Sequence, residues 1–391
     1  MFKRAYLQPQ HAEFAARVEG FLDAHVVPHH ADWAARGGGL PRALWQEAGA
    51  AGLLCRTVPQ VYGGPGGDLL EAAVITAALR QRRISGFLTC LQSDIVAPFV
   101  LKLGREDQKR HWLPALASGN AVGAIAMTEP QGGSDIAGIE TTARRHGDSI
   151  VLNGTKTHIS NAMTADVIIV AARTVLPDSG DPARRSQPAI SLVMVEAERP
   201  GITRQPIDKA GMPALDTGTI TFEDCVVPAA NLLGAEHMGF VYLMTFLGIE
   251  RLVLATYAQA CAERLLRDLI ADCDARKTAA GSLLDYQNTR FVLADLYSAC
   301  AVNRAFVDHC LIAAQGGRSD PKAACIAKLR VTDTLRQIAA FGVQFRGAAG
   351  ISGATGARAS QDMLDSAVQS VWGGTSEIMR DVIGQGLASV L

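Results

Sequence analysis

The chain lacks an excess of charge of either sign. Its 37 lysine and arginine residues are balanced by 38 aspartate and glutamate residues, which gives a formal net charge of −1. It also contains no basic stretch, so it has no long-range electrostatic attraction for nucleic acid or for an anionic membrane. We therefore expect that nucleic acid is not a partner.

Cysteine pairs and zinc-ligand patterns are missing as well. The eight cysteines are scattered without a CxxC pair, and the nine histidines form no His-Glu-x-x-His pattern. His29 and His30 are adjacent and so do not share one helical face. The first residues, MFKRAYLQPQHAEF, contain no apolar signal core. We expect no metal site, reduced thiols and a cytoplasmic location.

One long apolar stretch, Met238 to Ala262, has the length of a membrane span. Its only charged residues, Glu250 and Arg251, lie at its middle, where charge is most costly in lipid. We therefore expect a buried helix here and no membrane span.

Length and hydrophobic periodicity divide the chain into three parts. A chain of 391 residues exceeds a single-core domain, and an apolar content of 48% is enough for a sizeable core. The pattern predicts an α+β fold with an N-terminal all-α domain (1–122), a middle β-domain (123–234) and a C-terminal four-helix bundle (235–391).

The expected elements follow from helical or alternating apolar spacing. Helices are predicted at residues 14–26, from 41 onward, at 69–79, 94–103, 240–273, 286–314 and 320–341, and after 375. Strands are predicted at residues 149–159, 166–173, 189–196 and 217–222. A polar loop is expected at 177–188, and the glycine-rich segment 347–359 is expected to interrupt the bundle.

A glycine-rich loop is the first of three candidate chemical clusters. It runs from Ala126 to Asp135, and a second segment, Leu152 to Asn161, follows it. Thr128, Ser134 and two glycines can offer hydroxyls and backbone N–H groups to an anionic cofactor. The same composition also fits an ordinary turn between strands.

Glu250 marks the second cluster, in the long apolar helix. It does not face its neighbour Arg251, because adjacent helical residues point in different directions. A carboxylate in apolar surroundings has a raised pKa, which suits a general base near neutral pH. The alternative is a structural ion pair with another helix.

The third cluster is Trp372 to Met379, with the sequence WGGTSEIM. Its two glycines permit a close backbone approach to a ligand at a helix start. Thr375 or Ser376 can also serve as a plain helix cap.

Together the clusters resemble the acyl-CoA dehydrogenase family. The resemblance covers almost the whole chain and is most specific at MTEPxxGSD, LNGxKxxISNA and WGGTSEIM, in family order. Glu250-Arg-Leu resembles the long-chain and isovaleryl branch, which carries its base on the bundle helix. Other members carry the base in the final motif, where this chain has Gly373.

The resemblance implies FAD as cofactor and a particular set of contacts. FAD would contact Ile125, Met127, Thr128, Gly133, Ser134, His158, Ile159, Ser160, Thr375 and Glu377. A neighbouring subunit would supply Arg276, Thr278, Gln287, Gln344 and Gly347, which implies a homodimer or homotetramer. The acyl thioester would contact Ser134, Gly248, Arg251 and Gly374.

The reaction implied is the α,β-dehydrogenation of an acyl-CoA thioester to the trans-2-enoyl thioester. Glu250 would take the α-proton, the flavin would accept the β-hydrogen as a hydride, and the N–H at Gly373 would bind the thioester oxygen. An electron-transferring flavoprotein would receive the electrons. Alternatives are an acyl-carrier-protein-bound substrate, an oxygen-using oxidase or monooxygenase of this fold, and a binding protein without turnover.

The chain departs from the family pattern at several positions, among them His158, Ala279 and Ala280. His158 stands where relatives place another aromatic residue near the flavin. Ala279 and Ala280 replace the phenylalanine and glycine of the Arg-x-x-Phe-Gly segment, which predicts a weaker or differently shaped site at the adenosine end of FAD.

Overall fold

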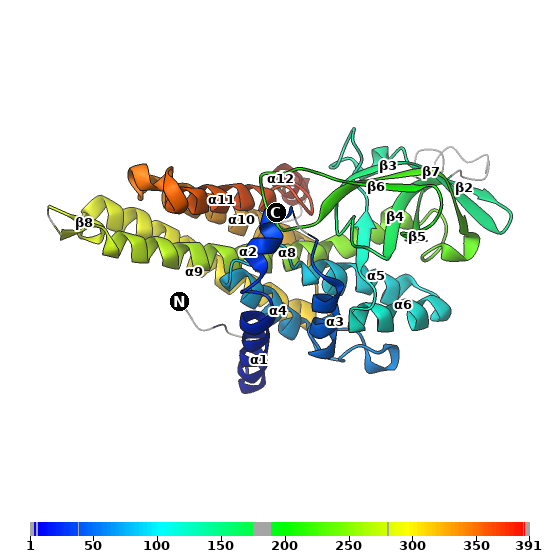
Figure 1. The fold of residues 1–391 in the computed structure, drawn as a ribbon, viewed down its shortest axis with the longest axis horizontal. Helices are drawn as coiled ribbons and strands as arrows, with labels where there is room; N and C mark the ends of the chain where they lie inside the picture. The colour runs from blue at the N-terminus through cyan, green and yellow to red at the C-terminus, as the bar shows by residue number, and fades with distance from the viewer. Residues whose placement is uncertain are drawn as a thin grey trace.

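The computed structural model describes residue 4, residues 7–37, 39–174, 189–279 and 281–385, and residue 387. The polar loop predicted at residues 177–188 lies outside the described residues, as does Ala280. The chain forms a helical N-terminal part, a β-sheet and a long C-terminal helical bundle (Figure 1). This arrangement confirms the predicted α+β fold.

The N-terminal part is helical, as expected. Its helices are α1 (Pro9–His25), α2 (His30–Ala35), α3 (Arg42–Ala50), α4 (Leu69–Gln81), α5 (Ala97–Leu103) and α6 (Glu106–Ser118). The start of α4 is fixed by Asp68, whose carboxylate accepts the N–H of Glu71 at 2.8 Å. A π-helical turn, η2 (Leu91–Val96), leads directly into α5, so the helix predicted from residue 94 begins earlier and is irregular. Helix α6 was not predicted.

The middle part is a twisted seven-stranded sheet. Its strands are β1 (Gly123–Ala126), β2 (Thr142–His146), β3 (Ser149–Ser160), β4 (Val167–Thr174), β5 (Ile190–Glu196), β6 (Ile202–Pro206) and β7 (Thr217–Pro228). The strand order is β1-β4-β2-β3-β7-β6, and β5 pairs with β4. All four predicted strands are present, and β7 extends beyond the predicted end at residue 222.

The C-terminal part is a bundle of long helices. These are α8 (Gly239–Ala275), α9 (Gln287–Gln315), α10 (Pro321–Gln344), α11 (Gly353–Gln369) and α12 (Ser376–Gln385). Two short strands, β8 (Lys277–Thr278) and β9 (Gly281–Ser282), form a hairpin at the bundle tip, far from the large sheet (Figure 1). The expected interruption at 347–359 is shorter than predicted, because α11 already begins at Gly353.

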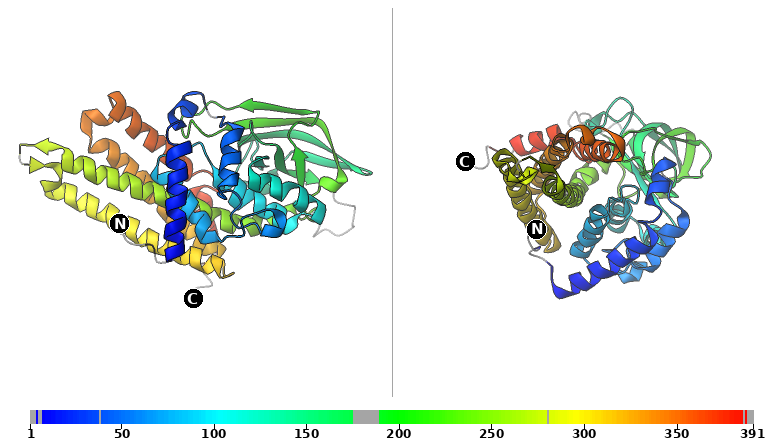
Figure 2. Two further views of the ribbon diagram at one scale, coloured as in Figure 1. Left: turned by 60° about the horizontal axis from the view of Figure 1, so that its bottom comes forward. Right: turned by 60° about the vertical axis from the view of Figure 1, so that its left-hand side comes forward.

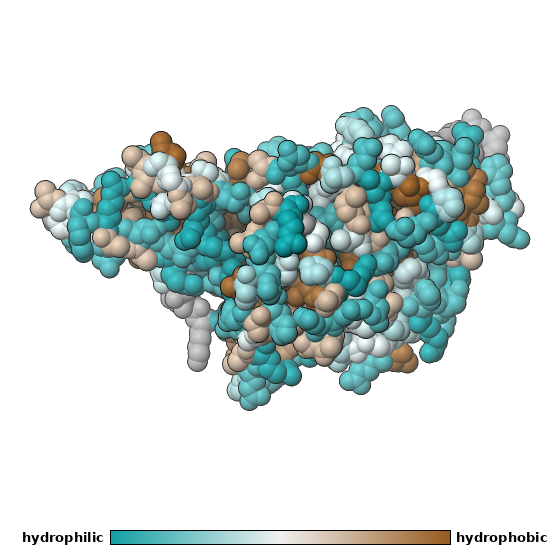
Figure 3. Space-filling model, viewed as in Figure 1, coloured by the Kyte–Doolittle hydropathy of each residue, from teal (hydrophilic) through white to brown (hydrophobic). Residues whose placement is uncertain are grey.

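Single-turn 3₁₀ helices connect several of these elements. They are η1 (Gln60–Tyr62), η3 (Ile136–Gly138), η4 (Ala229–Asn231), η5 (Leu283–Asp285) and η6 (Gly347–Gly350). In the views of Figures 1 and 2, the bundle projects to one side of the N-terminal helices and the sheet lies on the other side. The face shown in Figure 3 is mainly hydrophilic, with hydrophobic residues in small separate groups.

Helix α8 connects the two ends of the molecule. Among the described residues it is the one helix whose length and composition would allow a membrane crossing, but 56% of its most apolar window is buried inside the structure. It packs against α4, α9 and α10. The helix is therefore part of the protein core, as its central charges predicted.

Candidate active site

Glu250 lies at the middle of α8, where the sequence places the candidate base. Its side chain is half-buried. Burial raises the pKa of its carboxyl to about 7, and the positive charges of Arg251 and Lys328 only partly oppose this shift. Within the described part of the chain, Glu250 has neither an ion pair nor a hydrogen bond through its side chain. This disfavours the alternative of a structural ion pair.

The glycine turn between α11 and α12 contacts this carboxyl group. Gly373 has a φ of +60° and Gly374 a φ of +92°, conformations that side chains other than glycine rarely adopt. A Cβ atom on Gly373 would lie 2.2 Å from Cδ1 of Leu254 and 3.3 Å from Oε1 of Glu250. The structure thus brings together the two positions at which the family carries its base. A side chain at Gly373 would have to displace the end of the Leu254 side chain.

Two buried cations flank the base, and one was missed from the sequence. Nζ of Lys328, on α10, donates to the carbonyl of Gly374 at 2.6 Å and so fixes the glycine turn. Burial lowers the pKa of Lys328 to about 8, while the charge of Glu250 opposes that shift. Arg251 donates to Sγ of Cys325 at 3.3 Å, and its buried Nε has no partner among the described residues.

Lys328 could have been found from its spacing. It lies four residues after Ala324 and three before Val331, both fully buried on α10, so helical periodicity places it on the apolar face. A lysine at such a position is seldom buried without a function or a partner.

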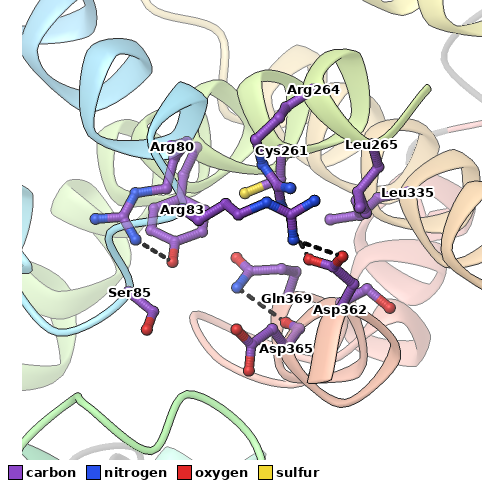
Figure 4. Close-up of a pocket in the computed structure, with 12 residues that line it drawn as sticks. Arg80, Arg83, Ser85, Cys261, Arg264, Leu265, Leu335, Asp362, Asp365 and Gln369 are labelled. Carbon is purple, nitrogen blue, oxygen red and sulfur yellow. Dashed lines mark hydrogen bonds and ion pairs between the residues drawn. The ribbon is translucent and has the colours of Figure 1, made fainter. Parts of the chain in front are cut away.

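A second polar cluster supports the turn from behind. The ring of Trp372, which precedes Gly373, makes an edge contact with Tyr257 at 5.4 Å between centroids. Arg80 stacks over the Tyr257 ring at 4.1 Å and donates to its hydroxyl at 2.6 Å. Arg80 lines the same pocket as Asp362 (Figure 4), which forms ion pairs with Arg83, just after the end of α4, and with Arg264 from α8. The cluster ties α4, α8 and α11 together next to the glycine turn.

The glycine-rich loop after β1 is built around a buried ion pair. Nζ of Lys156, on β3, lies 2.7 Å from the carboxylate of Glu129, and both side chains are almost fully buried. Burial acts to raise the pKa of Glu129, but hydrogen bonds from Lys156, Thr141 and the Glu140 N–H outweigh it and hold the pKa at about 2. Both residues lie in the motifs MTEPxxGSD and LNGxKxxISNA, but their pairing is not evident from the sequence.

Most of the predicted cofactor-binding residues around this ion pair are exposed or half-exposed. Met127 and Thr128 directly follow the strand β1, and a Cβ on Gly133 would lie 3.3 Å from Thr128. Ser134 is exposed in the loop that follows. In the part of the chain that the structure describes, the hydroxyls of Thr128, Ser134 and Ser160 have no hydrogen-bond partner. Ile125 is buried beneath the loop.

His158 lies on a β-bulge at the end of β3. The register with β7 shifts between Lys156 and Ile159. His158 has a φ of +56°, and its side chain is exposed, whereas Ile159 is buried. Bulges re-aim side chains, and strained backbone of this kind clusters at functional sites. The histidine is therefore directed outward at the position expected for an aromatic contact with the flavin.

In the last cluster, the structure shows the helix cap that the sequence left open. Oγ1 of Thr375 accepts the N–H of Ile378 at 3.3 Å and so caps α12. Glu377 is exposed in the first turn of this helix. Gly248 lies on α8 close to Pro321 at the start of α10, half a turn before Glu250.

The remaining predicted cofactor residues lie at the opposite end of the molecule. Arg276 donates to the carbonyl of Phe345 at 2.6 Å and lies beside Gly347, and Thr278 is hydrogen-bonded to Tyr286. Gln287 begins α9 and Gln344 ends α10 at the same tip (Figure 1). One chain therefore does not bring these residues to the glycine-rich loop.

We also searched the described residues for side chains grouped as metal ligands. The described residues contain no group of three or more His, Cys, Asp or Glu side chains arranged to hold a metal ion. All eight cysteines are free thiols.

Comparison with known families and structures agrees with this geometry. Family models for the acyl-CoA dehydrogenase N-terminal, middle and C-terminal domains match residues 8–120, 124–225 and 237–388. The crystal structure of an acyl-CoA dehydrogenase from Geobacillus kaustophilus superimposes with a TM-score of 0.93 at 36% identity, covering 98% of this chain and 100% of that one.

Two curated relatives are similar over most of their length. The long-chain specific acyl-CoA dehydrogenase of Sus scrofa mitochondria is 36% identical over 349 residues, which cover 89% of this chain and 80% of that protein. The mitochondrial isovaleryl-CoA dehydrogenase of Pongo abelii is 33% identical over 346 residues, with 88% and 80% covered. The family is one of FAD-binding oxidoreductases that act on CH–CH bonds. This chain belongs to the acyl-CoA dehydrogenase family.

Proposed function

We propose that this chain catalyses the FAD-dependent α,β-dehydrogenation of an acyl-CoA thioester to the trans-2-enoyl thioester, with Glu250 as the base. The observation that carries the proposal is the environment of Glu250. Its carboxyl has no partner within the described residues, its pKa is raised to about 7, and it lies against the glycine turn. A base with these properties is half ionised near neutral pH and free to accept a proton.

The residues of the glycine-rich loop fit FAD. Free hydroxyls at Thr128 and Ser134, the outward His158 ring and the start of α12 at Thr375 offer donors and a stacking surface to a large polar cofactor. When bound, FAD supplies the two-electron oxidation by accepting the β-hydrogen as a hydride.

The chain itself supplies proton transfer and electrostatic stabilisation. Glu250 accepts the α-proton of the thioester. The N–H of Gly373 has no acceptor among the described residues, so it can donate to the thioester oxygen as negative charge develops there. The charges of Arg251 and Lys328 lie close enough to lower the pKa of Glu250, and the same field stabilises enolate character beside it.

The proposal includes a homodimer or homotetramer. The separation of the expected cofactor residues between the glycine-rich loop and the bundle tip supports it. Phe291 and Val302, 11 residues apart on one face of α9, are 59% and 69% exposed, which is unusual for large apolar side chains on one face. An electron-transferring flavoprotein as the electron acceptor and a cytoplasmic location complete the proposal.

The test is an anaerobic titration of the FAD-reconstituted protein. Straight, branched and aromatic acyl-CoAs are added in turn, and the flavin absorbance is followed. Bleaching by one class supports the proposal and defines the acyl group. Bleaching only by acyl groups on a carrier protein would replace the CoA substrate. Rapid reoxidation of the reduced flavin in air would instead indicate an oxidase or monooxygenase.

A further inference from the structure

Asp94 is a buried carboxylic acid without a partner. It lies in η2, and the residue is 8% exposed. Its Oδ1 atom is fully enclosed and has no hydrogen-bond partner, and no ion pair to Asp94 exists among the described residues. Burial raises the pKa of this carboxyl to about 7. An unpaired acid of this kind destabilises the fold, so its presence requires an explanation.

The neighbouring polar residues of the same turn are fully engaged. Gln92 accepts the N–H of Gly123 at 3.1 Å and donates to the carbonyl of Leu116 at 2.7 Å. Oγ of Ser93 accepts the N–H of Cys55 at 2.8 Å. Of these three polar residues, Asp94 is the one whose side chain makes no hydrogen bond to another described residue. The turn is also π-helical. Such turns are rare in proteins overall, and many of them lie at functional sites.

The turn η2 packs on the face of α8 that carries the base. Phe246, Glu250, Val253 and Tyr257 are spaced by four, three and four residues, so they form one stripe along α8. The ring of Phe99, in α5, stacks on Phe246 at 4.4 Å between centroids.

The residues on either side of Asp94 belong to the same layer. Leu91 and Ile95 form one hydrophobic cluster with Val253 and Tyr257. The turn that carries Asp94 therefore shares an apolar layer with Ile249 and Val253, which lie beside Glu250 on α8.

We propose that Asp94 determines substrate specificity by accepting a hydrogen bond from a hydroxyl or amino group on the acyl part of the substrate. The inference rests on the proposed function, because a thioester whose α-carbon lies at Glu250 extends its acyl group into this layer. An unsubstituted hydrocarbon tail that displaces water from this layer leaves the Asp94 carboxyl without a hydrogen-bond partner. A tail with a hydrogen-bond donor satisfies it.

The test compares acyl-CoAs that differ by one polar group. For the chain length that reduces the flavin best, kcat/KM is measured for the unsubstituted acyl-CoA and for derivatives with a hydroxyl or an amino group at successive carbons beyond the β-carbon. We expect the best derivative to exceed the unsubstituted compound by about tenfold or more in the wild type. The Asp94→Leu variant should reverse this preference and gain activity on the unsubstituted chain.

Two further variants make the result specific. Ser93→Ala alters the same turn and should keep the wild-type preference. Asp94→Asn is isosteric and still accepts a hydrogen bond, so it should keep a preference for a hydroxyl and lose one for an amino group. If Asp94→Leu does not fold, Asp94→Ala, which removes the carboxyl group without adding bulk, serves in its place and should likewise lose the preference.

The two proposals can fail separately. A wild type that prefers unsubstituted chains over every derivative, or a preference that is unchanged in both Asp94 variants, overturns the inference while the dehydrogenase activity stands. The absence of flavin reduction by any acyl-CoA overturns the proposed function and this inference with it.

Discussion

Replacing Gly373 by alanine should damage both stability and catalysis. The left-handed backbone at φ +60° costs an alanine about 1–2 kcal/mol. Its Cβ would also lie 2.2 Å from Cδ1 of Leu254, and such overpacking costs about 1–3 kcal/mol. Together they amount to about 2–5 kcal/mol, which is a fall of several degrees in Tm for a chain of this size.

Catalysis should fall for a related reason. The new Cβ would lie 3.3 Å from Oε1 of Glu250, so the carboxyl or the turn has to move. A small misplacement of a reacting group can cost about a hundredfold in rate. The assays are the thermal midpoint of the FAD-loaded protein and the rate of anaerobic flavin reduction.

Two variants control this experiment. Leu254→Val removes the clashing Cδ1, so the double variant should recover part of the lost midpoint relative to the sum of the single changes. Gly384→Ala, in a helix with nothing within 4 Å of the new Cβ, should not lower the midpoint. An unchanged midpoint and rate in Gly373→Ala would refute the reasoning from the turn geometry.

Three other changes test separate parts of the site. In Glu250→Gln, adding Gly373→Glu should not restore activity, because Leu254 occupies the space that the new side chain needs; recovered flavin reduction would show that the positions are interchangeable. Lys328→Met removes a charge that lowers the pKa of Glu250, so the acid limb of kcat/KM, set by the ionised base and expected near pH 7, should move to higher pH; an unmoved limb contradicts this. Glu129→Gln leaves Lys156 buried without its counter-charge, so the variant should lose about 3–5 kcal/mol of stability and hold less FAD, as absorbance and unfolding measurements would show.

Much of the fold could be predicted because the hydrophobic pattern is strong. The long apolar period of α8 and the alternation in β3 and β4 gave these elements to within about two residues of their ends. Glu250 could be singled out because a charge in the middle of an apolar helix requires a reason. The glycine turn was recognisable because consecutive glycines indicate backbone that other residues cannot adopt.

The partners of these residues were not predictable in the same way. The hydrogen bond of Lys328 to Gly374 and the Glu129–Lys156 pair join segments distant in the sequence, which no local pattern reports; helical spacing indicates only that Lys328 is buried. Asp94 looks like an ordinary helix residue in the sequence, because only the packed structure shows that its neighbours are satisfied and it is not. Helix α6 was missed because its sequence is mainly polar and its apolar spacing is weak.

The most direct test of the role of Glu250 is single-turnover flavin reduction in the absence of oxygen. Wild type and Glu250→Gln, both reconstituted with FAD, are mixed with the acyl-CoA that bleaches the wild type most. The account predicts that the variant binds FAD normally but reduces it at least about a hundredfold more slowly, the low end for loss of a general base. Near-normal reduction in the variant would contradict the assignment of Glu250 as the base.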